Sequence, residues 1–275
     1  MELLERLESL GGVARRSELP RTAADQRVLL DGVQGGRLRD LGSGWMATVD
    51  ASPAMVAARQ FRGAITCVSA APFYNLAQLR PPDRAHVAIP RSRGVRQAPY
   101  PVAVHREGAW TPPEGLPIAP LVAVLHRVLR CRPAEEAVVM IDSALNKRLI
   151  TIEQIADLLR GPGSPRALAT LQRCHRGSRS PIETLARLAL TDAGLEVEAA
   201  VVVPGVGEVD LLVEGWVVVE CDGFAYHSGR REYREDRRRD RELAAKGYVV
   251  LRFTWEEIMT SPEAVVRAVL QVLRP

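Results

Sequence analysis

Three acidic residues stand at the ends of two short apolar segments in the stretch VDLLVEGWVVVECDGFAYH, residues 209–227. Asp210 opens the first segment, and Glu220 and Asp222 close the second. A buried carboxylate is costly unless a cation compensates its charge. Because carboxylate oxygens are the ligands that Mg²⁺ and Mn²⁺ prefer, we predict that Asp210, Glu220 and Asp222 hold one of these ions.

Such a metal would support hydrolysis of a phosphodiester bond, because it can activate water and neutralise the charge that develops on a phosphate. Two further residues could take part in this chemistry. Glu183 could add a carboxylate from a preceding helix, or it could be an exposed glutamate that the helix dipole favours. His227 could act as a general acid or base, or it could have a structural role.

The segment 181–275 predicts a compact mixed α/β unit. Helices are expected at 181–193, 233–246 and 262–273, and strands at 196–203, 209–213, 216–221 and 248–253. Glu220 and Asp222, two residues apart on one strand, leave the same face. A two-residue turn at Glu214-Gly215 would pair Asp210 with Val219 and point it to the opposite face, whereas a three-residue connection or a bulge would restore the shared face. The metal hypothesis therefore predicts an irregular turn.

The expected helix at 233–246 lies in an arginine-rich run, RREYREDRRRDRELAAKG, residues 230–247. Glu235 or Asp236 can pair with Arg239, because residues three or four apart on a helix are neighbours. A positive surplus remains after such pairing and could hold a phosphate backbone beside the acidic site. The nucleic-acid contacts expected from this run are Arg230, Arg231, Arg234, Arg238 and Arg239.

Residues 1–50 predict three short helices followed by a hairpin, which is the order of a winged helix. The helices are expected at 2–10, from Ser17, and at 22–33, and the hairpin turns at 42–44. A third helix of this kind usually enters the major groove of DNA. The expected DNA contacts are Arg21, Gln26, Arg27, Arg37 and Arg39. The same face could equally serve a protein partner, or the module could be a helical cap without a special purpose.

Residues 51–175 predict a mixed α/β and helical middle region, with strands at 86–90 and 101–106 and helices at 53–61, 69–79, 121–129, 134–147, 151–159 and 165–174. A polar stretch at 175–181 suggests the boundary with the last domain, residues 180–275. The fold class expected for the chain is therefore α/β (α+β).

The overall composition, 47% hydrophobic and 25% charged residues with a net charge of +4, is typical of a globular protein. Four scattered cysteines, with neither a CxxC pair nor histidines at a spacing typical of structural zinc, suggest reduced thiols in a cytoplasmic protein. The N-terminus lacks the pattern of a signal peptide, and no apolar stretch approaches membrane-spanning length, so no membrane association is expected.

The C-terminal residues resemble the family called domain of unknown function 559, which is related to very-short-patch repair endonucleases and belongs to the PD-(D/E)XK nuclease superfamily. The resemblance rests on Glu183, Asp210, Glu220-Cys-Asp222-Gly223, His227, Asp236-x-x-Arg239-Asp240-x-x-Leu243, Gly247 and the LRF of residues 251–253. Residues 1 to about 170 more weakly resemble the AbiEi-type antitoxin arrangement, a winged helix followed by a mixed α/β domain.

This resemblance implies a restriction-endonuclease-like sheet in which Asp210 and Glu220 bind Mg²⁺ or Mn²⁺, Glu183 is an auxiliary acid and His227 is a candidate base. Asp222 departs from the pattern, because the superfamily has a lysine there. His227 or an arginine of the 230s helix would have to replace that lysine. The leading hypothesis is a metal-dependent DNA endonuclease targeted by the winged helix. The alternative is a non-catalytic, DNA-binding regulator of the antitoxin type with a degenerate nuclease fold.

Overall fold

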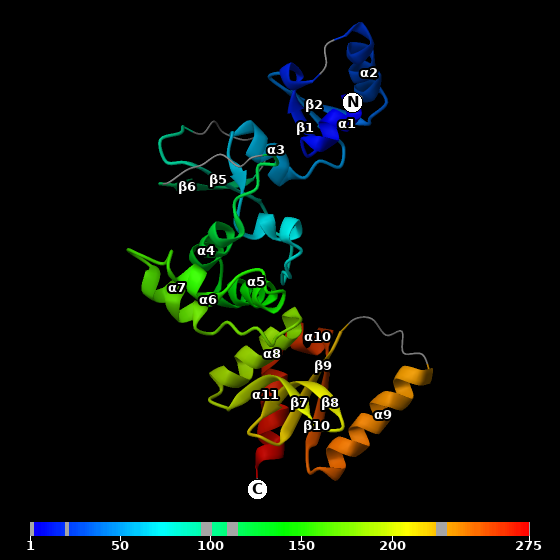
Figure 1. Ribbon diagram of the computed structural model, residues 1–275, viewed down its shortest axis with the longest axis vertical. Coiled ribbons are helices and arrows are strands. Elements are labelled where there is room, and N and C mark those ends of the chain that lie inside the picture. The colour runs from blue at the N-terminus through cyan, green and yellow to red at the C-terminus, as the bar shows by residue number, and fades with distance from the viewer. Residues whose placement is uncertain (1–2, 20–21, 95–100, 109–114, 224–229, 275) are drawn as a thin grey trace. The chain divides into compact units, whose positions relative to one another are not determined.

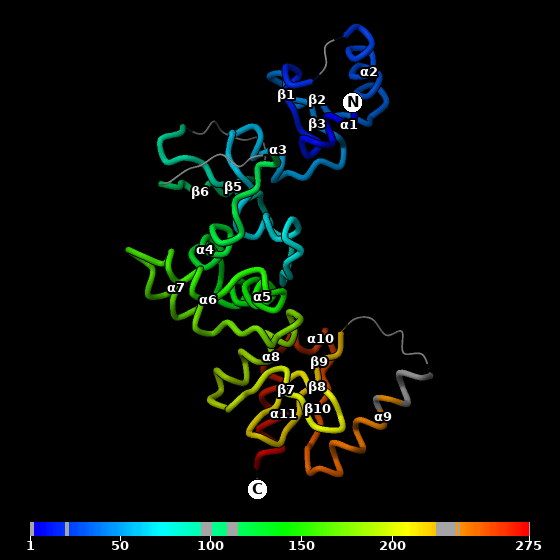
Figure 2. Tube along the Cα trace, in the orientation of Figure 1, coloured from blue at the N-terminus to red at the C-terminus, as the bar shows by residue number. Residues whose placement is uncertain are grey.

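The chain forms two compact units, residues 1–75 with 80–131 and residues 76–79 with 132–275. The computed structural model describes residues 3–19, 22–94, 101–108, 115–223 and 230–274, without the side chains of residues 230–234 and 236. Figure 1 shows the helices and strands, and Figure 2 traces the chain through them. Within these described ranges, no helix combines the length and the apolar character needed to cross a lipid bilayer.

The N-terminal part of the first unit packs two helices on a small antiparallel sheet. Its elements are α1 (Leu3–Ser9), β1 (Val13–Arg15), η1 (Arg16–Glu18), α2 (Ala23–Gln34), β2 (Leu38–Gly42) and β3 (Trp45–Thr48). The strand order is β1-β3-β2, and Leu7, Leu38 and Met46 lie in the buried core. The helix predicted from Ser17 is wrong. Residues 13–15 pair with β3, so only a three-residue 3₁₀ turn remains before α2.

The rest of the first unit contains a second three-stranded sheet. Its elements are α3 (Pro53–Gln60), β4 (Ala64–Ile65), η2 (Cys67–Tyr74), β5 (Ala85–Pro90), β6 (Val102–Glu107) and α4 (Leu121–Cys131). The strand order is β4-β5-β6, with β5 and β6 parallel. The strands predicted at 86–90 and 101–106 are confirmed. The helix predicted at 69–79 is instead the 3₁₀ helix η2, which contains Pro72, a residue without a backbone N–H to donate.

The second unit begins with helices that pack against the C-terminal sheet domain. These helices are α5 (Ala134–Asn146), α6 (Ile152–Ala156) and α7 (Ser164–Leu171), and α5 contacts α8 (Pro181–Asp192). Buried Asp142 of α5 accepts hydrogen bonds from Thr184 and Arg187 of α8. The boundary expected at 175–181 therefore lies inside the second compact unit.

The C-terminal domain is a four-stranded mixed sheet with helices on both faces, as predicted. After α8 come β7 (Val197–Val203), β8 (Gly207–Val213), β9 (Val217–Asp222), α9 (Arg230–Ala245), β10 (Val249–Thr254), α10 (Trp255–Thr260) and α11 (Pro262–Leu273). The strand order is β10-β9-β8-β7, and β10 is parallel to β9 while the other neighbours are antiparallel. Residues of α8, α10 and α11 form one buried cluster with the sheet, and Leu243 of α9 joins another with Leu212 and Val218.

The connection between β8 and β9 has three residues, which is one of the two irregular arrangements that the metal hypothesis predicted. Val213 pairs with Val217, which leaves residues 214–216 as the connection, and Leu211 pairs with Val219. Glu214 and Gly215 both adopt positive φ, which lets this short connection reverse the chain. Continuing the register by one residue sets Asp210 opposite Glu220. The two-residue turn that would have separated these acids is therefore excluded.

Candidate active site

Two hydrogen bonds hold Glu183 at the start of α8, one through its backbone N–H and one through its carboxylate. The Ser180 hydroxyl accepts a hydrogen bond from the Glu183 N–H at 3.2 Å, and the Glu183 carboxylate accepts one from the Arg179 N–H at 2.7 Å. Pro181 at the start of the helix suits this position because its missing N–H would have no helical partner. Glu183 is buried, with a relative exposure of 5%. The alternative of an exposed helix-start glutamate is therefore wrong.

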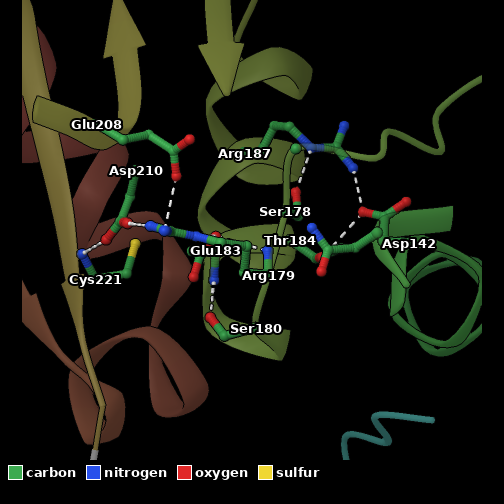
Figure 3. Close-up of polar contacts among 12 residues, drawn as sticks. Asp142, Ser178, Arg179, Ser180, Glu183, Thr184, Arg187, Glu208, Asp210 and Cys221 are labelled. Atoms are coloured by element: carbon green, nitrogen blue, oxygen red, sulfur yellow. Dashed lines mark hydrogen bonds and ion pairs between the residues drawn. The ribbon is translucent and has the colours of Figure 1, made fainter. Parts of the chain in front are cut away.

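Arg179 connects the start of α8 to the acids of β8. Its guanidinium donates to Asp210 Oδ1 at 2.7 Å and pairs with Glu208 Oε1 at 2.7 Å (Figure 3). The other carboxylate oxygen of Asp210 accepts a hydrogen bond from the backbone N–H of Cys221 at 2.8 Å. Asp210 is thus buried in the middle of β8, and Arg179 on one side and the Cys221 N–H of β9 on the other set its orientation.

Glu220, on β9, is paired with an arginine of α9. Arg239 Nη2 lies 3.1 Å from Glu220 Oε1 and donates to the Glu208 carbonyl at 2.8 Å. Of the two pairings expected for Arg239, the one with Glu235 is wrong, because Glu235 contacts Arg238 instead, and the one with Asp236 involves a side chain outside the described residues. Arg239 therefore lies beside the buried acids.

The buried acids influence one another electrostatically. Burial raises the pKa of Glu183 above its ordinary value, and the charge of Asp210 adds to that effect. Burial likewise raises the pKa of Glu220, again with a contribution from Asp210, and Arg239 opposes the change. Glu183, Asp210 and Glu220 therefore form a site of concentrated negative charge, which is the environment that favours cation binding.

Asp222, the third predicted ligand, has a different surrounding. It is half-buried at the end of β9, and one of its carboxylate oxygens lies 3.5 Å from Arg252 Nη1. Arg252 also donates to Asp240 of α9 at 2.9 Å.

His227 lies outside the described residues, as do Arg21 and the side chains of Arg230, Arg231 and Arg234. Arg238 is half-buried and pairs within α9.

The DNA contacts expected in the N-terminal part lie on α2 and the following hairpin. Gln26, Arg27 and Arg37 are exposed, whereas Arg39 donates to the carbonyls of Thr48 at 3.2 Å and Ala51 at 2.9 Å. A groove of about 570 Å³ beside α2 is lined by Arg16, Ser17, Gln26, Leu29, Leu30, Val33 and Asp40. Arg39 is therefore held by backbone carbonyls, and the accessible face of α2 is partly apolar.

Sequence reasoning missed two groups of residues. Arg179 and Glu208 belong to the acidic site, although Arg179 stands in a polar stretch that resembled a domain boundary. In the first unit, Cys67, His86, His105 and Cys131 place their ligand atoms within 4.8 Å of one another. The cysteines were expected to be scattered thiols without a spacing typical of structural zinc, yet the fold brings two of the four, Cys67 and Cys131, together with two histidines. Among the residues that the structure describes, these four form the group whose ligand atoms lie within 4.8 Å of one another. The acids of the second unit do not form such a group.

Comparison with known proteins identifies the class of the C-terminal domain. The family model REase_MTES_1575, of a restriction-endonuclease-like family, matches residues 183–273, about a third of the chain. This domain is therefore nuclease-like, and the match spans Glu183, Asp210 and Glu220. No curated protein matches the chain significantly. The crystal structure of the Rv2827c protein from Mycobacterium tuberculosis is similar at 19% identity and a TM-score of 0.41, covering 68% of this chain and 80% of that one.

Proposed function

We propose that the protein is a divalent-metal-dependent DNA endonuclease whose N-terminal residues 1–50 form a winged helix that directs it to DNA. The observation that carries this proposal is the placement of the buried acids Asp210 and Glu220 opposite one another on the neighbouring strands β8 and β9. Glu183 of α8 lies in the same electrostatic site. The restriction-endonuclease-like family match over residues 183–273 supports assigning these acids to phosphodiester hydrolysis.

The chemistry of the site fits Mg²⁺ or Mn²⁺. Asp210 and Glu220 offer carboxylate oxygens, which these hard ions prefer, and Asp222 offers a further one at the same strand end. Burial, with a contribution from the charge of Asp210, raises the pKa values of Glu183 and Glu220, and a bound cation would favour their charged forms. When bound, the metal would activate water and neutralise charge on the scissile phosphate.

Arg179 and Arg239 take the place of the lysine that the superfamily has where this chain has Asp222. Both contact the buried carboxylates directly, at 2.7 Å from Asp210 and 3.1 Å from Glu220. A guanidinium remains protonated at any physiological pH, so neither arginine can accept a proton. Their role is instead to hold the acids in place before a metal binds and to contact the phosphate once the acids are engaged by the metal.

The same pairing is what a non-catalytic regulator would show, because arginines that permanently neutralise the acids would leave a scaffold without a metal. The two functions differ in one outcome. A nuclease needs the Asp210 and Glu220 carboxylates for cleavage, but it should still bind DNA when they are replaced by asparagine and glutamine. The regulator binds DNA and cleaves none.

The test is a cleavage assay on supercoiled, nicked, mismatched and single-stranded DNA and on RNA, each with Mg²⁺ and with Mn²⁺. Wild-type protein is compared with Asp210→Asn and Glu220→Gln, and with Asp192→Asn as a matched control. Asp192 is also an acid of the second unit paired with an arginine, but its side chain is 63% exposed and far along α8 from Glu183.

The proposal predicts that wild type and Asp192→Asn cleave DNA, and that the other two variants lose cleavage by at least about a hundredfold, since a metal contributes several kcal/mol to the transition state. Binding of a labelled duplex, followed by fluorescence anisotropy, should persist in all four proteins. Intact DNA in every wild-type reaction would favour the regulator. Cleavage of RNA alone would retain the metal site and reject DNA as the substrate.

A further inference from the structure

Four residues that the nuclease proposal leaves unused meet in the first unit, and each comes from a different element. Cys67 opens η2, His86 lies on β5, His105 lies on β6 and Cys131 closes α4. His86 Nδ1 lies 3.0 Å from His105 Nε2, and Cys131 Sγ lies 3.7 Å and 3.9 Å from these two nitrogens. With Cys67 Sγ, all four atoms lie within 4.8 Å of one another.

The fold brings these side chains together through strand register. β5 and β6 are parallel, with His86 opposite Ala103 and Ala88 opposite His105. The two histidines are therefore one pleat apart on the same face of the sheet. Their rings stack with centroids 5.2 Å apart and planes 27° from parallel. The α4 C-terminus then supplies Cys131 to the same face.

The distances match the coordination sphere of zinc. Zinc binds histidine nitrogen at about 2.0–2.1 Å and thiolate sulfur at about 2.3 Å in a tetrahedron. Such a tetrahedron has edges of about 3.3 Å between nitrogens, about 3.6 Å between nitrogen and sulfur and about 3.8 Å between sulfurs. The observed 3.0, 3.7 and 3.9 Å are each within about 0.3 Å of these edges.

Burial and backbone conformation add independent support. Cys67 is fully buried and His86 is 2% exposed, so the cluster is shielded on that side from water. Cys67 adopts a left-handed φ of 53°, a conformation that residues with a Cβ rarely adopt. Such strained backbone persists where the surrounding structure fixes it, and it clusters at functional sites. The Nδ1 atom of His86, rather than its buried Nε2, faces the other ligands.

We propose that Cys67, His86, His105 and Cys131 form a tetrahedral Cys₂His₂ site that binds one Zn²⁺. Two thiolates and two imidazoles suit zinc rather than the magnesium class of ions. Because four protein ligands leave no open position, the role of the ion is structural. It ties the β6 edge strand to the start of η2 and to the end of α4.

The metal content of the purified full-length protein tests this proposal. Protein prepared without chelator, and then equilibrated with Zn²⁺ and desalted, is analysed by inductively coupled plasma mass spectrometry. The variants are His105→Ala and Cys131→Ser, whose side chains are half-buried and so disturb packing less than changes at the buried ligands. His126→Ala, a histidine on α4 outside the cluster, and Cys174→Ala, a cysteine of the second unit, are matched controls.

One Zn²⁺ per chain is expected in wild type and in both controls, and less than about a tenth of that in His105→Ala and Cys131→Ser. Asp210→Asn should keep its zinc, which separates this site from the acidic one and makes the result independent of nuclease activity. Replacing Zn²⁺ with Co²⁺ should give thiolate-to-cobalt absorption bands in wild type that both cluster variants lack.

Folding is monitored by far-ultraviolet circular dichroism, so that loss of metal in a folded variant is distinguished from loss of the fold. If a cluster variant does not fold, metal-free wild type is titrated with Co²⁺ instead. The thiolate-to-cobalt absorption is then expected to saturate at one equivalent of Co²⁺ per chain. Absence of stoichiometric zinc in folded wild type, or full zinc in a folded cluster variant, would overturn the proposal. A disulfide between Cys67 and Cys131 in metal-free protein, detected by mass spectrometry, would replace it with a redox pair.

Discussion

Removal of the buried cation at Arg187 should destabilise the second unit far more than removal of an exposed one nearby. Asp142 is 1% exposed and accepts hydrogen bonds from the His175 N–H, the Thr184 hydroxyl and Arg187 Nη2 at 2.7, 2.9 and 2.7 Å. Arg187, with a side chain 9% exposed, is the cation that compensates its charge (Figure 3). Arg187→Met leaves that carboxylate buried and uncompensated.

The expected cost is about 3–5 kcal/mol in the free energy of unfolding, because an unpaired buried charge loses its compensation without regaining water. The matched control is Arg173→Met. Arg173 also pairs with an aspartate, Asp192, at 2.7 Å, but both side chains are more exposed. An exposed pair contributes about 0–1 kcal/mol, so the control should lose no more than that. The contrast between the two variants isolates burial as the cause.

The assay is urea unfolding followed by circular dichroism and by tryptophan fluorescence, with Trp216 and Trp255 reporting on the second unit. Burial raises the pKa of Asp142 in spite of Arg187, and loss of Arg187 raises it further. A carboxyl with a raised folded pKa contributes stability below its unfolded pKa of about 3.9, and that stability is lost as pH rises. The deficit of Arg187→Met should therefore grow from pH 4 upward, and adding Asp142→Asn should reduce it. Equal losses in Arg187→Met and Arg173→Met, or a deficit independent of pH, would refute this reasoning.

Three further predictions concern a glycine, two buried glutamates and an arginine. Gly63→Ala should lower stability by about 1–3 kcal/mol, since its Cβ would meet a β5 carbonyl oxygen at 2.4 Å, while Gly108→Ala, which meets nothing within 4 Å, should change melting little. Burial raises the pKa values of Glu183 and Glu220, so the free energy of unfolding should fall as pH increases above about 4.3. The affinity for Mn²⁺ should rise over the same pH range, and calorimetric titration at several pH values measures that affinity. Arg179→Gln should bind Mn²⁺ more tightly than wild type by calorimetry, because a cation that competes for the aspartate is removed; unchanged affinity would show that no competition exists.

The parts of the fold that follow from local pattern could be predicted. Short apolar segments between turn residues identified the strands of the C-terminal sheet, and parity along the strands predicted an irregular β8–β9 connection, either of three residues or with a bulge. Asp210 and Glu220 stood out because they interrupt these apolar segments, where a charge is costly. Short strands such as β1 and β4 were missed, because two or three residues show no period and are defined by their partner strand.

Contacts between distant segments could not be predicted. Arg239 contacts Glu220 because α9 packs beside β9, a contact between segments that neither local sequence defines. The Cys₂His₂ cluster spans residues 67 to 131 without a local spacing motif, because parallel β5 and β6 create the proximity. One long-range contact does have a local indication. Asp142 is an acid within the largely apolar helix AEEAVVMIDSALN (α5, Ala134–Asn146), and such an acid indicates that the helix is buried against a cationic partner.

We propose above all that the facing acids Asp210 and Glu220 of β8 and β9 perform metal-dependent cleavage of DNA. The most direct test is the single-turnover rate of cleavage of a labelled duplex with Mn²⁺, measured at equal bound DNA for wild type, Asp210→Asn and Asp192→Asn. A loss of at least about a hundredfold in Asp210→Asn alone is expected. A rate in Asp210→Asn equal to that of wild type would show that cleavage does not depend on this site.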